Sequence, residues 1–173
     1  MGLVIAVATI ASYGAIWWIL GLRAAGSGST LGYAGAAIVL ALLVGAAWGR
    51  TRDESPERRR ERAKRGYTIG LVTGIQAVVI LVALKMLRDA GRDDLLTPVV
   101  AMIVGLHFLA FARLFPARAY YVTSALLVAL GAAGLLLDAG RVRVLAVSIG
   151  ASCILWLTCV AVLIWPESRR SAA

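Results

Sequence analysis

The chain has 173 residues, of which 61% are hydrophobic and only 16% are charged. A soluble domain of this length is usually about half apolar and about a quarter charged, so the composition argues against a soluble fold. The net charge of +9 would suit a nucleic-acid partner. No RNA- or DNA-binding motif accompanies it, and an excess of cytoplasmic Lys and Arg is the better interpretation in so apolar a chain. We therefore expect no nucleic-acid partner.

Six apolar stretches are long enough to cross a bilayer, because a transmembrane helix needs ~20 apolar residues. In chain order, the predicted spans cover residues 3–22, 31–49, 67–87, 95–112, 119–137 and 144–165. The alternating apolar and polar positions of a transmembrane β-barrel are not found in the sequence. The sequence therefore predicts an all-α fold. It is a single transmembrane domain, residues 1–173, in which six helices form three helical hairpins.

The connection after the second span, residues 50–66, is strongly basic. Its Lys and Arg residues are Arg50, Arg52, Arg58, Arg59, Arg60, Arg62, Lys64 and Arg65. The positive-inside rule makes this loop cytoplasmic, and an even number of spans then puts both termini on the cytoplasmic side. Ser55 and Pro56 form a helix start signal, so a helix should begin there and continue into the third span. The loop could dock a protein partner, hold anionic lipid, or serve only to fix the topology.

The three connections on the opposite side share a pattern. They read LRAAGSGSTL, LRDAGRDDLL and LLDAGRVRVL, and each has Ala-Gly just past an apolar stretch, at Gly26, Gly91 and Gly140. A glycine after a helix end supplies the left-handed residue that closes the helix. The pattern fits three hairpins descended from one unit. It also fits a good helix stop used three times in a chain rich in Ala and Gly.

Small residues recur every four positions in most of the spans. Examples are Gly45 and Gly49, Gly66, Gly70 and Gly74, Ala11 and Ala15, and Ala125, Ala129 and Ala133. In lipid the hydrophobic effect does not drive helices together, so close packing of backbones at small residues contributes much of their association. We expect these stripes to be helix–helix contacts, or faces for a second copy or a partner helix.

Few side chains in the spans suit chemistry. No Asp or Glu lies in the middle of a predicted span, whereas proton- or cation-coupled carriers usually need an intramembrane carboxylate. Cys153 and Cys159 are six positions apart on one predicted helix and therefore point to different faces, which argues against a disulfide or a metal pair. We expect no metal site and no cofactor.

The single histidine of the chain, His107, lies in the apolar stretch GLHFLAFARLF. Arg113 follows it by roughly 9 Å along the helix axis. An imidazole at this depth should face the bundle and find a partner, so we expect it to line a modest polar pocket. The predicted ligand-binding residues are His107, Arg113, Gln76, Tyr13, Trp17, Ser124 and Trp156. The alternative for His107 is an interhelical hydrogen bond that only fixes packing.

The size of the chain, its six short spans and the pattern ASYGA, Ala11 to Ala15, resemble one known family. They are similar to the substrate-binding S-components of energy-coupling-factor vitamin transporters. The resemblance implies that a small-residue face of the first helix contacts a shared transmembrane partner. No vitamin-binding motif of that family is found here, so no binding residue is transferred.

The sequence predicts a small multi-pass protein of the bacterial plasma (inner) membrane, with membrane lipids as partners. Its expected function is to bind or translocate a small or lipid-like molecule, alone or as a subunit of a larger assembly. One alternative is a membrane-embedded enzyme acting on an amphipathic substrate, with His107 as the acid/base and Arg113 binding an anionic group. Another is a structural or accessory subunit. The sequence does not indicate an oligomeric state.

Overall fold

The computed structural model describes residues 2–27, 29–51, 56–114, 118–138 and 140–164. These ranges contain helices and turns but no strand. The helices are α1 (Gly2–Ala24), α2 (Thr30–Thr51), α3 (Pro56–Asp89), α4 (Leu96–Leu114), α5 (Arg118–Leu136) and α6 (Arg141–Ile164), with a short 3-10 helix, η1 (Asp93–Leu95), before α4. All six α-helices contain a stretch long and apolar enough to cross a membrane. The prediction of an all-α, six-span membrane protein is confirmed.

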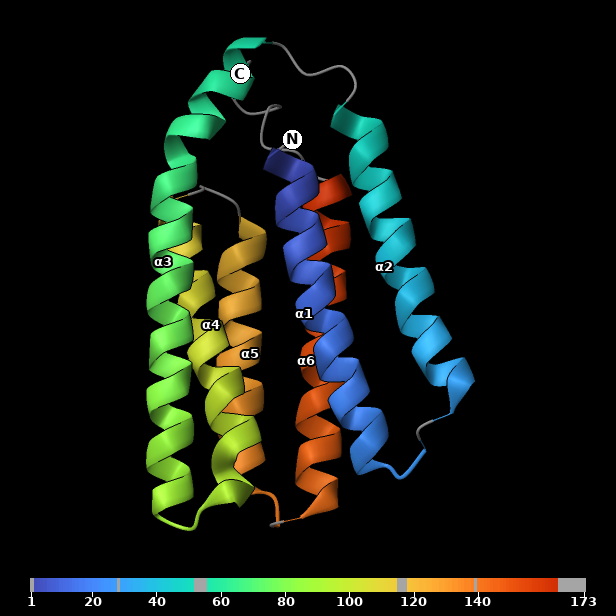
Figure 1. The fold of residues 1–173 in the computed structure, drawn as a ribbon, viewed down its shortest axis with the longest axis vertical. Coiled ribbons are helices and arrows are strands. Elements are labelled where there is room, and N and C mark those ends of the chain that lie inside the picture. Colours follow the sequence, from blue (N-terminus) through green and yellow to red (C-terminus); the bar gives the residue numbers. More distant parts are fainter. Residues whose placement is uncertain (1, 28, 52–55, 115–117, 139, 165–173) are drawn as a thin grey trace.

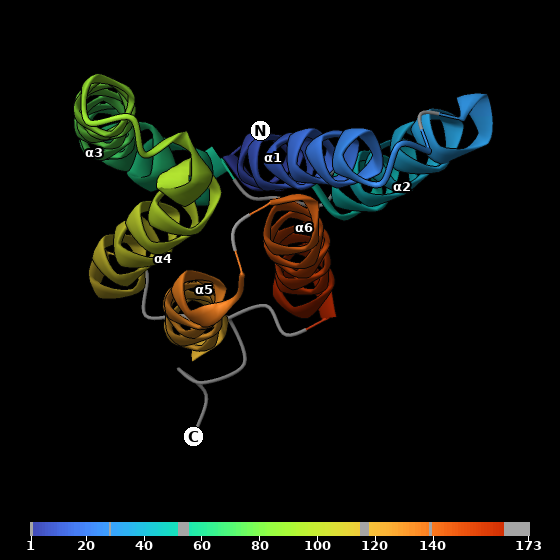
Figure 2. The same ribbon diagram turned by 90° about the horizontal axis from the view of Figure 1, so that it is seen from below.

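Consecutive helices run antiparallel (Figure 1). Across the bundle, the packing order is α2, α1, α6, α5, α4, α3, so the first and last helices of the chain are neighbours at its centre (Figure 2). The two most extensive interfaces are those of α4 with α5 and of α1 with α6. Both lie between the predicted hairpins rather than within them, so the hairpin arrangement stays a prediction.

Two clusters of buried side chains hold the bundle together. The larger one lies among α1, α4, α5 and α6, with Trp17, Val104, Phe108, Tyr120, Leu127, Val147 and Leu155 among its members. The smaller one joins α1, α2 and α6 through Val7, Ala11, Leu43, Ala47, Cys159 and Leu163. Large apolar side chains on the outer faces of α2 and α3, such as Leu42 and Leu81, are exposed. That pattern is expected where lipid covers a helix.

Helices approach closely at glycines, but these glycines are not those of the stripes predicted on the second and third spans. A Cβ atom added to Gly131 of α5 would lie 2.7 Å from the Pro98 carbonyl oxygen of α4, and one added to Gly105 would lie 2.9 Å from the Val128 backbone nitrogen. Apart from the helix's own backbone and the adjoining residues, no atom lies within 4 Å of such a Cβ at Gly45, Gly49, Gly70 or Gly74. As contacts within the described bundle, these two predicted stripes are wrong, because they lie on faces that point away from neighbouring helices.

The predicted glycine stops are confirmed at Gly26 and Gly91, each of which lies two residues after the last residue of its helix. Gly26, Gly91 and Gly140 have φ angles of 70°, 65° and 125°. At the first turn the Ser27 N–H donates to the Leu22 carbonyl at 3.1 Å, and at the second the Arg92 N–H donates to the Leu87 carbonyl at 2.8 Å. Both are the 6→1 bond of a Schellman motif. The third turn differs, because the Gly140 carbonyl accepts the Val144 N–H at 3.3 Å and so helps to start α6.

Candidate functional site

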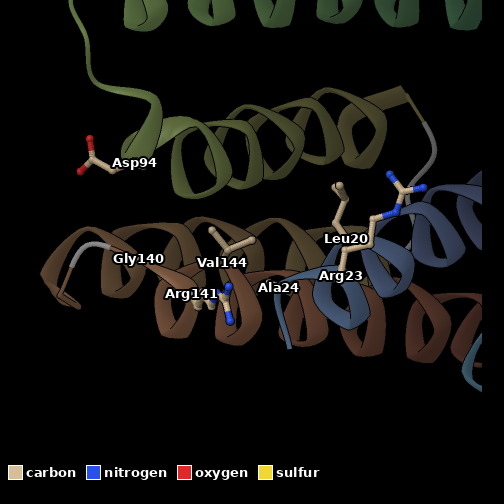
Figure 3. Close-up of a pocket in the computed structure, with 7 residues that line it drawn as sticks. All are labelled: Leu20, Arg23, Ala24, Asp94, Gly140, Arg141 and Val144. Carbon is tan, nitrogen blue, oxygen red and sulfur yellow. The ribbon is translucent and has the colours of Figure 1, made fainter. Parts of the chain in front are cut away.

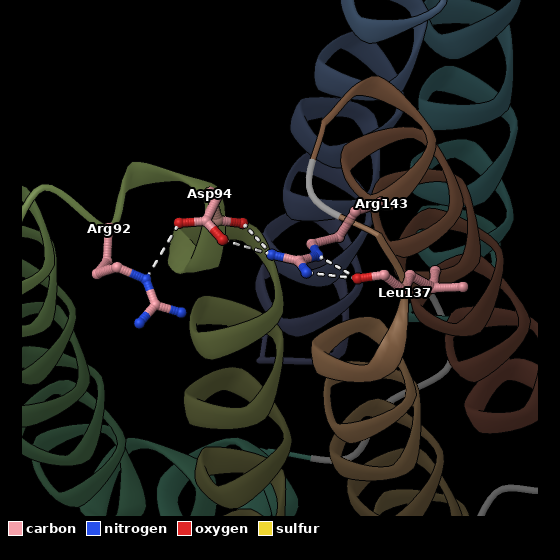
Figure 4. Close-up of polar contacts among 4 residues, drawn as sticks. All are labelled: Arg92, Asp94, Leu137 and Arg143. Atoms are coloured by element: carbon pink, nitrogen blue, oxygen red, sulfur yellow. Dashed lines mark hydrogen bonds and ion pairs between the residues drawn. The ribbon is translucent and has the colours of Figure 1, made fainter.

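A buried arginine lies in the first turn of α6. Arg143 is 5% exposed. Its Nη1 donates to Asp94 Oδ2 at 2.7 Å and to the Asp94 carbonyl at 3.2 Å. Its Nε donates to the Leu137 carbonyl at 3.1 Å, and Nη2 donates to the same oxygen (Figure 4). The guanidinium therefore joins η1, the end of α5 and the start of α6.

The sequence prediction missed Arg143, because the predicted sixth span begins just after it. A signal was present in RVRVL. Residues two apart on a helix point about 200° away from each other, so Arg141 and Arg143 cannot face the same surroundings. When one guanidinium faces the surface, the other points to the opposite side of the helix, where a buried guanidinium needs an anionic partner. In the structure Arg141 is exposed and Arg143 is buried.

Asp94 also faces a second arginine. Its Oδ1 lies 3.5 Å from Nε of Arg92, and its side chain is 30% exposed, so the carboxylate reaches the surface at this end of the bundle. Both of its oxygens are thus engaged by guanidinium groups (Figure 4).

An open groove of about 530 Å³ lies beside this carboxylate. It is lined by Leu20, Arg23 and Ala24 of α1, Asp94 of η1, and Gly140, Arg141 and Val144 at the start of α6 (Figure 3). Arg23 and Arg141 are exposed, and neither forms an ion pair within the described residues. The groove therefore combines an apolar wall with positive charge that the described residues leave unpaired. Such a surface complements an anionic group attached to an apolar chain.

The predicted ligand-binding residues lie elsewhere, and none of them lines this groove. His107 is half-buried on α4, about 17 Å along the helix from Leu96. Its ring and that of Phe111 form a T-shaped pair at a centroid distance of 4.4 Å, and the Phe108 ring lies at 6.3 Å. Arg113, at the end of α4, is exposed.

The remaining predicted residues are spread over four helices. Trp17 is buried in the same core cluster as Phe108, and Ser124 of α5 and Gln76 of α3 are also buried. Tyr13 is 41% exposed. Trp156 is half-buried and its indole N–H donates to the Ala11 carbonyl at 3.3 Å. Trp17 thus belongs to the core cluster that also contains Phe108, a ring neighbour of His107, whereas Tyr13 and Arg113 reach the outside of the bundle.

Buried hydroxyl groups form a further polar feature. The Thr123 and Thr158 hydroxyls lie 2.6 Å apart, and each also lies within hydrogen-bond distance of the carbonyl four residues earlier. Ser148 and Ser152 of α6 are fully buried, and their hydroxyls have no hydrogen-bond partner. As for metals, no group of three or more His, Cys, Asp or Glu side chains comes together in the part of the chain that the structure describes.

Residues 66–165 match a family described as a family of unknown function, DUF7010. The matched region runs through most of α3 and all of η1, α4, α5 and α6. It contains Asp94, His107, Arg143 and the two buried serines. No curated protein and no solved structure matches the chain. Because the match covers more than half of its length, the chain belongs to the DUF7010 family.

Proposed function

We propose that this multi-pass membrane protein binds an anionic amphiphile in the groove between α1, η1 and α6. The observation that carries the proposal is the unpaired positive charge of Arg23 and Arg141 beside the apolar wall of the groove. The carboxylate in the lining, that of Asp94, does not neutralise them, because Arg143 and Arg92 already engage it.

The chemistry of the lining favours a lipid-like molecule over a free ion. Guanidinium groups bind phosphate and carboxylate oxygens through paired hydrogen bonds, and arginines at a helix end reach the level of lipid head groups. Leu20 precedes Arg23 on α1 and Val144 follows Arg141 on α6, so both lie further along their helices toward the middle of the bundle, where an acyl chain would pack. In the bacterial plasma membrane, which is the location we propose, anionic phospholipids would supply such a molecule.

The test compares binding of phosphatidylglycerol and phosphatidylcholine to the purified protein by native mass spectrometry. We expect the wild type to retain phosphatidylglycerol preferentially. The Arg23→Gln/Arg141→Gln variant should lose about ten-fold or more of that preference, since each charge-assisted hydrogen bond contributes ~1.5–3 kcal/mol. Inorganic phosphate is the competing probe. If it binds as tightly as the lipid, the ligand is a small anion and the proposal of an amphiphile is wrong.

Arg113→Gln is the matched control, because Arg113 is also an exposed arginine at a helix end but lies far from the groove. We expect this variant to keep the lipid preference of the wild type. An unchanged preference in the double variant, with a loss in Arg113→Gln, would place the ligand at the opposite end of α4. That end carries the site predicted from the sequence.

His107 stays a second candidate for ligand contact. Its imidazole is half-buried and forms T-shaped contacts with the rings of Phe108 and Phe111. Gln76 lies on the neighbouring antiparallel helix, about 20 Å before the end of α3, and so at a similar depth in the bundle.

A further inference from the structure

The unpaired hydroxyls of Ser148 and Ser152 need a physical account. An unpaired polar group inside an apolar bundle is unfavourable, and serines in helices commonly bond to the carbonyl four residues earlier. Thr123 and Thr158 have such a carbonyl within reach. Ser148 and Ser152 are equally buried and form no hydrogen bond. Their hydroxyls are therefore free to bind something that the chain itself does not supply.

The position of these serines connects them to the groove. Arg141, Ser148 and Ser152 lie on one face of α6, because seven residues make about two turns and four make about one. Along the α6 axis, Ser148 lies about 10 Å further into the bundle than Arg141, and Ser152 lies about 6 Å beyond Ser148. On the facing helix, Gly21 lies between the groove residues Leu20 and Ala24.

The two helices approach closely below the groove. A Cβ atom added to Gly21 would lie 3.4 Å from Cβ of Ser148 and 2.7 Å from Cδ1 of Ile149. Ser148 thus lies at the contact between α1 and α6, next to the groove on its membrane side. Ser152 lies one helical turn further into the bundle. One turn beyond Ser152, the Trp156 ring lies across Gly14 and donates to the Ala11 carbonyl.

We propose that the contact between α1 and α6 is an entry path for the polar head group of the amphiphile. The proposal rests on the proposed function of the groove. The anionic oxygens pass from Arg141 to Ser148 and then to Ser152, each of which donates a hydrogen bond to them. Trp156 ends the path. The path opens by separation of α1 from α6 at Gly21, where the atoms nearest to the position of a Cβ belong to the flexible Ile149 side chain and the small Ser148 side chain.

The test is cysteine accessibility in lipid vesicles, on a protein that carries Cys153→Ala and Cys159→Ala. Ser148→Cys and Ser152→Cys are treated with a small anionic methanethiosulfonate. Ala151→Cys is the control, because Ala151 is equally buried on the same helix but belongs to the core cluster. We expect modification at both serine positions and none at the control. Vesicles that contain phosphatidylglycerol should protect the serine positions, and vesicles of phosphatidylcholine alone should not.

A second variant closes the path. Gly21→Ala places a methyl group between Ile149 and Ser148, so we expect it to suppress modification of Ser148→Cys. The lipid preference of the groove should stay intact. Serine positions that are unreactive, or that react no faster than Ala151→Cys, overturn the entry path. They leave the groove proposal standing if Arg23→Gln/Arg141→Gln still loses its lipid preference. If instead the serine positions react as expected but Arg23→Gln/Arg141→Gln keeps the lipid preference of the wild type, the proposed function of the groove is wrong.

Discussion

Nη1 of Arg143 donates a hydrogen bond to Oδ2 of Asp94 at 2.7 Å, across 49 positions of sequence. A positive charge in the first turn of a helix opposes the helix dipole, so α6 alone would disfavour Arg143 there. The same guanidinium also binds the Leu137 carbonyl, which follows the C-terminal, negative end of α5. A carboxylate and a helix C-terminus together compensate a buried charge that neither would satisfy alone.

Arg143→Ala should destabilise the protein strongly. It leaves the Leu137 carbonyl without its two donors and removes the closest partner of Asp94. Breaking a buried ion pair by deleting one partner is strongly unfavourable, so we expect the unfolding midpoint in detergent to fall by roughly 5–10 °C. Arg143→Lys should restore only part of the lost midpoint, because an ammonium group lacks the planar set of N–H donors with which a guanidinium binds two acceptors. Tryptophan fluorescence during heating measures the midpoint.

The control for this series is Arg141→Ala, two positions away and exposed. Its midpoint should stay close to that of the wild type, since it has no ion pair within the described residues. Equal midpoints for Arg143→Ala and Arg141→Ala would show that the contacts of Arg143 with Asp94 and Leu137 do not stabilise the bundle.

Gly131→Ala tests the close approach of α4 and α5. The added Cβ would lie 2.5 Å from Cγ of Met102 and 2.7 Å from the Pro98 carbonyl oxygen. Met102 can move, but the backbone oxygen can move only with α4. Overpacking of this kind costs about 1–3 kcal/mol, and we expect a lower unfolding midpoint. Gly70→Ala is the matched control, because its Cβ meets nothing within 4 Å. A midpoint that falls equally in both variants would assign the loss to something other than helix contact.

The elements of the fold could be predicted because each depends on local sequence. Apolar length gives the spans, and Pro56 begins α3 as its position after Ser55 predicts. The glycine stops at Gly26 and Gly91 follow from one backbone conformation. These features need no knowledge of which helices are neighbours.

The contacts between helices could not be predicted in the same way. A glycine stripe looks identical in sequence on an inner and on a lipid-facing surface, since both are apolar. Gly70 and Gly74 therefore resembled contact residues, while the close approach occurs at Gly105 and Gly131. The groove needs α1, η1 and α6 side by side. These segments are far apart in sequence, and nothing in their local patterns indicates that the first and last helices are neighbours.

The resemblance to transporter S-components implies a partner helix at Ala11 and Ala15. In the structure Ala11 is fully buried and belongs to a cluster with Cys159 and Leu163 of α6. Trp156 also donates to the Ala11 carbonyl. This part of α1 is thus already covered by the chain's own last helix. A partner on α1 would have to use another face.

His107→Phe separates packing from ligand contact. The ring stays aromatic and can keep its edge contact with Phe111, so we expect an unfolding midpoint within about 2 °C of the wild type. If the imidazole nitrogens bind a ligand, native mass spectrometry of the variant will lose a molecule that copurifies with the wild type. Retention of every copurifying molecule, together with an unchanged midpoint, leaves His107 with a packing role only. It would remove the sequence-predicted site from consideration.

The sidedness of the groove follows from the predicted cytoplasmic location of loop 50–66. Its described residues belong to the end of α2 and the start of α3, which lie at the end of the bundle opposite the turns at Gly26 and Gly91 (Figure 1). The groove contains the last turn of α1 and the first turn of α6, so it lies at the same end as these turns. From the positive-inside rule we therefore predict that the groove lies at the extracytoplasmic leaflet.

Labelling of intact cells checks this placement in a protein that carries Cys153→Ala and Cys159→Ala. A membrane-impermeant maleimide should label Ser27→Cys, whose residue is exposed in the first turn. It should label Arg52→Cys of the basic loop only after the membrane is permeabilised. The reverse pattern would put the groove at the cytoplasmic leaflet. The charge and apolar lining of the groove would be unchanged, but the amphiphile would then enter from the opposite leaflet, which is the side where anionic lipids create a negative surface potential.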